Sequence, residues 1–302
     1  MGSRRGRLAI ALLVTAVAVG PGTFVPTLSP RDAYLRSLLR DGQATEVQTQ
    51  AWVQAGAEAL RRAKTVSLPS RDEGVFSAER PEAVAYAVDV RRGRRLSLAV
   101  HVDAAASLFV DLFRVEPDGG EPRWLASLES GRTSLTYDVD DDATYVARLQ
   151  PPLNRGGAFA IAQRTRPSLT FPVGAAAPRG PQSPFGVDRD AGRRRHEGID
   201  IFAPRGTPVV AVAGGIARAS TNRLGGNVVW LHGPTGRTYY YAHLDRWAVG
   251  PLTLVQAGDV VGYVGNTGNA ARTPPHLHFG VYQRGAVDPW PFVEPDQRIP
   301  SD

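Results

Sequence analysis

Hydrophobic positions follow three patterns along the chain, and each pattern predicts a different kind of structure. Residues 8–20 form an unbroken apolar run. Between residues 29 and 64, apolar side chains recur at helical spacing, which predicts a helix or a helical hairpin. From about residue 68 onward, short runs of alternating polarity are separated by turn residues, which predicts strands. We therefore expect a mostly β protein whose helices are confined to its first part.

The N-terminal segment, residues 1–28, predicts a signal peptide or a membrane anchor. Arg4, Arg5 and Arg7 precede an apolar run of about 13 residues, which is short for a membrane-spanning helix of about 20 residues. The alternative is a buried helix of a cytosolic domain. If the segment directs export, the rest of the chain works in the periplasm, in the cell envelope or outside the cell, and an uncleaved segment would anchor it to the membrane.

Residues 29–66 predict a helical spacer. Ser29 and Pro30 form a typical helix start, and Asp41-Gly42 is expected to end the first helix. A second helical stretch runs from Thr45 to Lys64 and carries a moderate apolar face that includes Trp52. We expect this segment to pack against its neighbours and to carry no chemistry.

Residues 67–165 predict an antiparallel β-sandwich domain. Seven strands spaced by Gly, Pro and Asp turns fit such a fold. These strands are expected at 83–90, 96–102, 108–115, 123–128, 134–139, 144–149 and 158–162. Asp138 and the run 140–142 are interpreted as an acidic hairpin turn, because calcium-loop spacing is missing.

A proline-rich linker is predicted at residues 166–183, ahead of a C-terminal antiparallel β-sheet domain at 184–302. Five prolines between residues 167 and 184 favour an extended, semi-rigid segment. The alternative is that Leu169 to Val173 packs along the C-terminal domain as an irregular strand. Beyond the linker, strand patterns follow one another with almost no helix signal.

Composition narrows the chemistry available to this fold. The 302 residues are 42% hydrophobic and 21% charged, which is ordinary for a globular protein. A net charge of +6 is compatible with nucleic acid, anionic lipid or an anionic wall polymer, but no nucleic-acid-binding motif accompanies it. The absence of cysteine excludes disulfides, thiolate metal sites and a cysteine nucleophile. Any zinc site must therefore use His, Asp and Glu.

Two histidines dominate the candidate chemistry of the C-terminal domain. His276 and His278 lie two residues apart in the apolar stretch Pro274 to Phe279. Because alternate residues of a strand project from the same face, the two imidazoles are expected to lie side by side. One of them could bind a metal while the other lies beside it.

A third histidine and an aspartate provide the remaining candidate ligands. His196 and Asp200 are four residues apart, across Gly198. His196-Glu197 invites comparison with the zinc helix H-E-x-x-H, but position 200 is Asp and the segment lacks a helical pattern. Together with one histidine of the pair, His196 and Asp200 would suit Zn²⁺ and leave a fourth position for water.

These motifs occur in an order that resembles one known family. His196-x-x-x-Asp200, Tyr241-Ala242-His243-Leu244, Gly262 to Gly268 and His276-Leu277-His278-Phe279 have the order and spacing of the lysostaphin-type (LytM-like) zinc endopeptidases. The match covers about residues 183–293. The stretch 144–159 weakly resembles the β-sandwich modules that accompany secreted peptidases.

The resemblance implies a zinc endopeptidase that hydrolyses peptide cross-links of bacterial peptidoglycan. It makes His196, Asp200 and His278 the ligands of one Zn²⁺, and His243 and His276 the residues that handle the water and the oxyanion. Which of the latter two is the base is left open. The implied partners are peptide stems or cross-bridges and no nucleic acid. One alternative is a catalytically silent wall-binding or hydrolase-activating domain, and another is a general secreted protease.

Other residues of the C-terminal domain admit two interpretations. His232 at a strand end is expected to be structural, as is His101 in the sandwich. The run Arg193 to Arg195 either meets an anionic wall polymer or is simply solvated. One of Tyr239 to Tyr241 is expected to line the site, since neighbouring strand residues face opposite sides.

Overall fold

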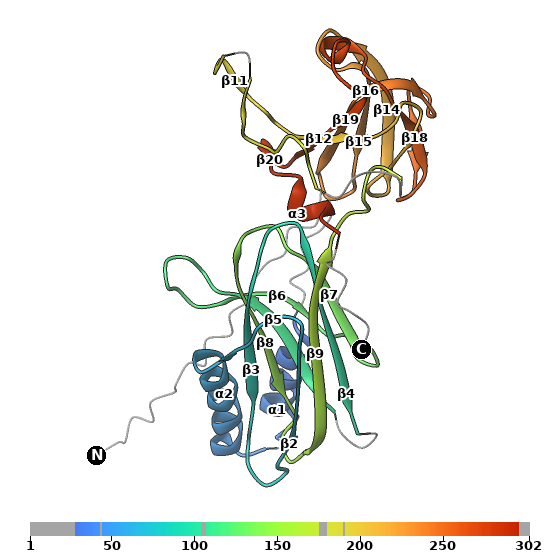
Figure 1. Cartoon of the computed structure of the whole chain (residues 1–302). Coiled ribbons are helices and arrows are strands. Elements are labelled where there is room, and N and C mark those ends of the chain that lie inside the picture. Colours follow the sequence, from blue (N-terminus) through green and yellow to red (C-terminus); the bar gives the residue numbers. More distant parts are fainter. Residues whose placement is uncertain (1–27, 43, 104–106, 175–179, 190, 296–302) are drawn as a thin grey trace, which may run out of the picture. The chain divides into compact units, whose positions relative to one another are not determined.

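The computed structural model describes residues 28–42, 44–103, 107–174, 180–189 and 191–295 (Figure 1). Residues 1–27 of the predicted export segment lie outside this set. Among the described residues, no helix is both long enough and apolar enough to cross a membrane. The chain is mostly β with antiparallel sheets, which confirms the predicted fold class.

Contacts divide the chain into two compact units. Among the described residues, the first lies within 28–90, 97–137 and 143–164, and the second lies within 91–96, 138–142 and 165–295. The first unit holds the two N-terminal helices and most of the sandwich, and the second holds the C-terminal sheet and one short helix.

Two helices open the described chain, as the sequence predicts. Helix α1 (Pro30–Asp41) starts at Ser29, whose side chain accepts a hydrogen bond from the Asp32 backbone, and ends at Gly42 in the left-handed conformation. Helix α2 (Glu46–Arg61) starts with a capping box between Thr45 and Gln48. These caps satisfy backbone groups that a helix end would otherwise leave unpaired.

All seven predicted strands are present in the sandwich, and two further strands join them. One sheet has the order β1-β3-β8-β5-β6, and the other has the order β2-β9-β4-β7. The bounds are β1 (Lys64–Thr65), β2 (Ser70–Phe76), β3 (Val84–Val90), β4 (Arg94–Val102), β5 (Phe109–Arg114), β6 (Arg123–Ser127), β7 (Ser134–Asp138), β8 (Ala143–Gln150) and β9 (Gly157–Pro167).

The two helices pack on the five-stranded sheet instead of standing apart from it. Trp52 of α2 is fully buried, and its indole N–H donates to the Pro151 carbonyl at 2.8 Å. Its ring contacts Tyr34 and Phe109 at centroid distances of 5.4 and 6.1 Å. Gln150 of β8 donates to the Trp52 carbonyl at 2.7 Å. The helical segment is thus part of the core of the first unit.

Replacing Trp52 by alanine is expected to lower the free energy of unfolding of the first unit by about 3–5 kcal/mol, because a buried aromatic ring leaves a cavity. Chemical denaturation followed by circular dichroism measures this change. Val47→Ala on the same helix is the control, since Val47 is 75% exposed and its loss is expected to cost less than about 0.5 kcal/mol. Equal effects of the two substitutions would contradict this account of the helices.

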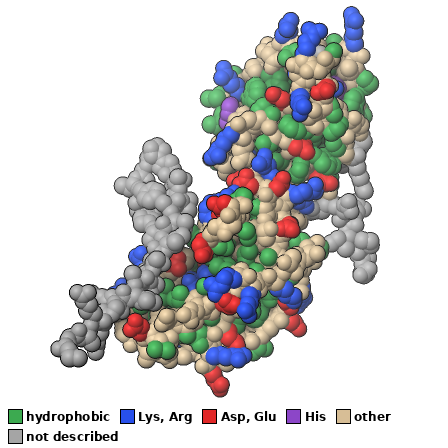
Figure 2. Space-filling model, turned by 90° about the vertical axis from the view of Figure 1, so that its left-hand side faces the viewer, with side chains coloured by type: hydrophobic (Ala, Val, Ile, Leu, Met, Phe, Trp, Pro, Cys, Tyr) green, Lys and Arg blue, Asp and Glu red, His purple; other side chains and the backbone are tan. Residues whose placement is uncertain are grey.

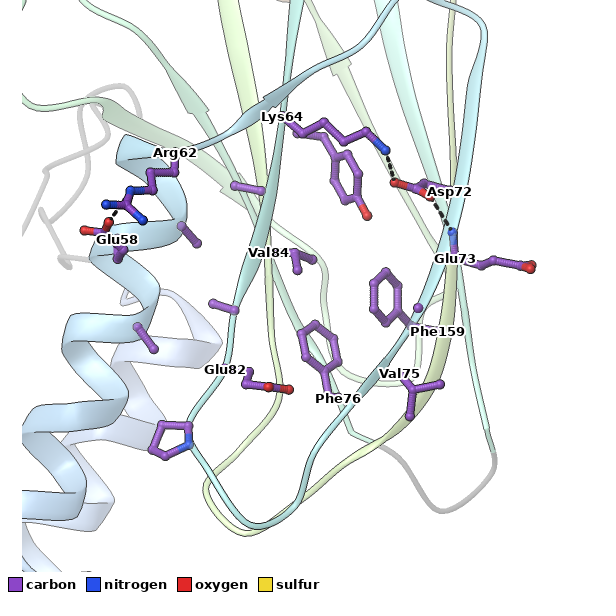
Figure 3. Close-up of a pocket in the computed structure, with 17 residues that line it drawn as sticks. Glu58, Arg62, Lys64, Asp72, Glu73, Val75, Phe76, Glu82, Val84 and Phe159 are labelled. Carbon is purple, nitrogen blue, oxygen red and sulfur yellow. Dashed lines mark hydrogen bonds and ion pairs between the residues drawn. The ribbon is translucent and has the colours of Figure 1, made fainter.

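A pocket of about 670 Å³ opens in the first unit between α2, β2 and β3 (Figure 3). Phe76 and Phe159 stack inside it at 4.7 Å, and Lys64 binds Asp72 at its edge. The strand β2 that borders it was not predicted, because its inward positions before Phe76 are Ser70, Asp72 and Gly74 and so carry no apolar alternation. The lining contains no histidine.

The predicted linker is partly built into the second unit. Leu169 and Val173 are buried in the core of that unit, and Val173 forms a β-bridge with Val209. The alternative of an irregular packed strand therefore holds for residues 169–173. Residues 175–179 of the linker lie outside the described set.

A large antiparallel sheet forms the second unit. Its main path is β12-β19-β16-β15-β14-β17, with β13, β18 and β20 attached. The bounds are β10 (Asp188–Arg189), β11 (Arg194–Arg195), β12 (Ile199–Phe202), β13 (Pro208–Val210), β14 (Gly215–Asn222), β15 (Gly226–His232), β16 (Thr238–Trp247), β17 (Thr253–Val255), β18 (Val260–Val264), β19 (His276–Tyr282) and β20 (Ala286–Val287), with a 3₁₀ turn (Gly268–Ala270) and helix α3 (Trp290–Val293). One face of the sheet is the core, which includes Tyr241, Leu277 and Phe279.

Arginines on the surface are engaged by nearby carboxylates. On the face drawn in Figure 2, basic and acidic side chains are interspersed. Arg205 binds Asp245 at 2.6 Å, and Arg95 binds Asp138 at 2.8 Å. In the acidic turn after β7, Asp141 lies 3.6 Å from Arg92.

Candidate metal centre

Strand pairing places the metal-type side chains on one face of the sheet. In the antiparallel pair of β12 and β19, Asp200 lies directly opposite His278, and Phe202 lies opposite His276. Directly opposite residues of paired strands project to the same side. His196, which precedes β12, reaches the same point. The structure therefore brings together the two motifs that lie about 80 residues apart in the chain.

Three ligand atoms converge at this point. The Nε2 of His196 lies 3.0 Å from Asp200 Oδ1 and 2.9 Å from His278 Nδ1, and His278 Nδ1 lies 3.0 Å from Asp200 Oδ1. Among the described residues this is the one group of three or more metal-type side chains that is close enough to hold an ion. A tetrahedral zinc ion with bonds of about 2.1 Å separates its ligand atoms by roughly 3.4 Å. The spacing is close to that of a zinc site.

Hydrogen bonding at the far side of His196 explains why a cation fits this cluster. Its Nδ1 lies 2.9 Å from the Pro184 carbonyl, which can only accept, so Nδ1 carries the proton. In the neutral ring Nε2 then presents a lone pair to a carboxylate oxygen and to the nitrogen of His278. Three lone-pair atoms at such distances repel one another unless a proton or a metal ion lies between them. The donor set therefore fits Zn²⁺.

A second pair of histidines lies beside the cluster. His243 of β16 and His276 of β19 have ring centroids 4.9 Å apart, and the His243 ring is 6.0 Å from that of His278. Each Nδ1 donates to a backbone carbonyl at 2.9 Å: that of Thr267 for His243, and that of Pro274 for His276. Both rings consequently keep Nε2 free for another partner.

The backbone at His243 has an unusual conformation. Its φ is +63°, a left-handed value that non-glycine residues rarely adopt, and its N–H donates to the Gly225 carbonyl at 2.7 Å. The left-handed conformation of His243 bends β16 at the point where its pairing with β15 becomes irregular. This bend directs the imidazole of His243 toward His276.

Comparison with known proteins supports the motif-based resemblance. Residues 194–289 match the profile of peptidase family M23.

The C-terminal part of this chain carries a peptidase family M23 domain.

The matched region contains the three residues of the cluster and the adjacent histidine pair: His196, Asp200, His278, His243 and His276. The resemblance predicted from the motifs is thereby confirmed.

Two curated relatives share this domain. The L-Ala--D-Glu endopeptidase of Bacillus subtilis (strain 168) is 38% identical over 109 residues, covering 33% of this chain and 33% of the relative. The peptidoglycan DD-endopeptidase ShyC of Vibrio cholerae is 36% identical over 87 residues, covering 28% of this chain and 20% of the relative. The chain thus spans a third or less of the length of these relatives.

A solved structure also matches the M23 domain. The catalytic domain of the antimicrobial peptidase lysostaphin from Staphylococcus simulans is 34% identical, with 37% of this chain and 88% of that chain covered, at a TM-score of 0.33.

Charges within the M23 domain keep Asp200 ionised. Burial alone would raise the pKa of the Asp200 carboxyl, but the ring nitrogens of His196 and His278, which can donate to it when the rings are protonated, outweigh burial and hold this pKa well below its usual range. Burial lowers the pKa of His278, although Asp200 opposes this effect. Burial, together with His276 and His278, lowers the pKa of His243 to about 4. Neutral imidazoles and an ionised carboxylate are the forms that bind metal.

Two features that the sequence patterns did not reveal hold this cluster in place. Arg189 donates to Asp200 Oδ2 at 2.8 Å and to the Ser183 hydroxyl at 2.5 Å, so the carboxylate is oriented from its outer side. Gly198 leaves room for the His278 ring, because an added Cβ would lie 2.7 Å from His278 Cε1 and 2.5 Å from the Phe279 carbonyl oxygen. Arg189 lies in a polar stretch without a recognisable spacing to the ligands, so it could be found only from the fold.

Alternation along β16 decides which tyrosine faces the site. Tyr239 and Tyr241 are buried on the core side, where Tyr241 accepts a hydrogen bond from the Val212 backbone. Tyr240 is partly exposed, and its ring lies 5.9 Å from that of His278. His232 is exposed at the end of β15, with Thr238 as its hydrogen-bond partner at 3.4 Å. His101 is exposed in β4.

Proposed function

We propose that the M23 domain is a zinc-dependent endopeptidase that hydrolyses peptide cross-links of bacterial cell-wall peptidoglycan. The observation that carries this proposal is the convergence of His196, Asp200 and His278 at 2.9–3.0 Å, with His243 and His276 directly beside them. The relatives are named for cleaving peptide bonds, one of them in peptidoglycan, which supports the substrate class.

The three converging side chains would hold the ion through His196 Nε2, Asp200 Oδ1 and His278 Nδ1. Bound Zn²⁺ supplies Lewis-acid polarisation of the scissile carbonyl and lowers the pKa of water. The remaining chemistry falls to His243 and His276. One of them, in its neutral form, accepts the proton of the attacking water at Nε2 and delivers it to the leaving amine. The other, as an imidazolium that carries protons at both Nδ1 and Nε2, donates from Nε2 to the developing oxyanion.

The proposed function also requires that the domain is exported from the cytoplasm. Peptidoglycan lies outside the cytoplasmic membrane, and the N-terminal segment of residues 1–28 has the pattern of a signal peptide or an anchor. We propose that the sandwich of residues 67–165, together with the helices that pack on it, forms one domain and that residues 184–302 form the catalytic domain. The two relatives are named for different bonds, so the bond that this chain cleaves has to be identified chemically.

Digestion of purified peptidoglycan tests the function. We expect the zinc-loaded full chain to release muropeptides with new amino and carboxyl ends, which mass spectrometry identifies and which name the bond. Casein offered in parallel should remain intact. A chain that contains one zinc ion and binds sacculi but releases nothing would instead be a silent wall-binding or activating protein. Cleavage of casein without release of muropeptides would indicate a general protease.

A further inference from the structure

Three aromatic rings lie together on the face of the sheet that carries the metal-type cluster. Trp230 of β15 is paired directly with Tyr240 of β16, and their ring centroids are 4.3 Å apart. Tyr282, four residues after His278 in β19, lies 5.6 Å from Trp230. All three side chains are partly exposed. They form an aromatic platform, defined here as Trp230, Tyr240 and Tyr282.

Gly280 keeps this platform open. It lies opposite Tyr240 in the sheet, between His278 and Tyr282 on the same face. A Cβ at this position would lie 3.1 Å from Tyr282 Cε2 and 3.6 Å from Tyr240 Cβ. A larger residue would therefore fill the space between the two tyrosine rings, which glycine leaves free.

A carboxylate lies at the edge of the platform. Glu197 is exposed, and the Tyr282 hydroxyl donates to its Oε2 at 3.5 Å. The Glu197 carbonyl oxygen lies 3.2 Å from the Cβ that Gly280 lacks, so the backbone of Glu197 borders the same space. Burial and the negative charge of Glu197 raise the pKa of Tyr282 to about 12, which keeps its hydroxyl a donor.

We propose that Trp230, Tyr240, Tyr282 and Glu197 form a subsite for an aliphatic primary ammonium group carried by the peptide substrate. Aromatic faces attract cations through their quadrupoles, and the methylene groups of an aliphatic amine pack on the same rings. The adjacent carboxylate adds a charged hydrogen-bond acceptor. A neutral sugar could stack on the rings but would make no use of the charge of Glu197.

The subsite lies beside the metal-type cluster, so it can select the substrate near the cleaved bond. This role rests on the proposed peptidase function. The Tyr240 ring lies 5.9 Å from that of His278. A substrate whose amine rests on the platform has its backbone next to the cluster. The free amine of a diamino acid in a peptide stem has the required chemistry, so the subsite selects stems by the side chain near the cleaved bond.

Matched peptides test the subsite by binding, independently of turnover. The probes are the tetrapeptide L-Ala-γ-D-Glu-L-Lys-D-Ala and its counterparts with Nε-acetyl-lysine, norleucine or glutamate in place of lysine. Isothermal titration to the zinc-loaded full chain carrying His276→Ala, in which turnover is expected to be at least about a hundredfold slower, should show roughly tenfold weaker binding when the amine is acetylated or absent. The glutamate peptide is included because Arg218 of β14, opposite Trp230, is exposed and would favour an anion.

Two substitutions locate the effect. Glu197→Gln keeps the shape of an exposed side chain and is expected to reduce the preference for the amine to about threefold. Trp230→Leu removes a ring of the platform and is expected to weaken binding of the lysine peptide by about tenfold. Trp247→Leu, which removes a 39% exposed indole elsewhere on β16, is the control and should leave the preference unchanged.

Equal binding of the lysine, acetyl-lysine and norleucine peptides would overturn the subsite, as would tighter binding of the glutamate peptide. An undiminished preference in Glu197→Gln would also overturn it. These results leave the proposed function standing if muropeptides are still released from peptidoglycan. Loss of release with the amine preference intact would instead reject the catalytic proposal and retain the subsite.

Discussion

His278→Ala is expected to abolish zinc binding and to lower peptidoglycan hydrolysis by about three orders of magnitude or more. Its Nδ1 lies 3.0 Å from Asp200 Oδ1 and 2.9 Å from His196 Nε2, so it closes the triangle of proposed ligands. Without it, an ion would keep one imidazole and one carboxylate, and structural and catalytic zinc sites have at least three protein ligands.

Metal content and turnover are to be measured on the same preparation. The zinc content measured by elemental analysis should fall from one ion per chain to a small fraction of that. The circular dichroism spectrum should stay that of a β protein. His232→Ala is the matched control, because this exposed histidine lies on the same sheet in β15 and has only Thr238 as a partner. A His278→Ala chain with full zinc content would show that the ligand assignment is wrong.

The second large effect is expected at the adjacent pair. His276→Ala and His243→Ala should each retain zinc but lower kcat by about a hundredfold to ten-thousandfold, because general acid–base groups contribute rate enhancements of this size. Neither Nε2 belongs to the converging triangle, and each Nδ1 is already committed to a backbone carbonyl. Their loss therefore removes proton transfer and oxyanion stabilisation without removing a ligand.

The double substitution separates joint action from independent action. If His243 and His276 serve one transition state, the loss in the double variant should be smaller than the product of the two single losses. Binding of uncleaved sacculi should be the same in all three variants. Unchanged turnover in His276→Ala would favour the silent wall-binding or activating protein over the enzyme.

Strand content was predictable wherever one face of a strand is buried. In the sandwich, β3 to β9 carry apolar residues at core positions, and β3 to β8 lie within two residues of their predicted bounds. Strand β9 (Gly157–Pro167) continues five residues beyond its predicted end at residue 162. Strand β2 was not predicted from the sequence, because its inward side chains before Phe76 are polar or, at Gly74, absent. The segment 169–173 was predicted as linker from its prolines, with packing as an irregular strand as the alternative, and Leu169 and Val173 do fill core positions.

The sequence by itself determined the chemistry that this chain has available. The absence of cysteine limits a metal site to His, Asp and Glu, and the period of a strand places His276 and His278 on one face. Motif order was enough to predict the M23 domain at the C-terminal part of the chain. These properties are local or compositional, so they need no knowledge of which strands pair.

Tertiary structure alone decided which residues meet. The register that sets Asp200 opposite His278 and Trp230 opposite Tyr240 joins segments far apart in the chain, and a shift of one residue would turn each side chain to the other face. The contacts of Arg189 with Asp200 and of Glu197 with Tyr282 arise from this pairing. Sheet register is fixed by the burial of the whole core face, which is a property of the complete fold.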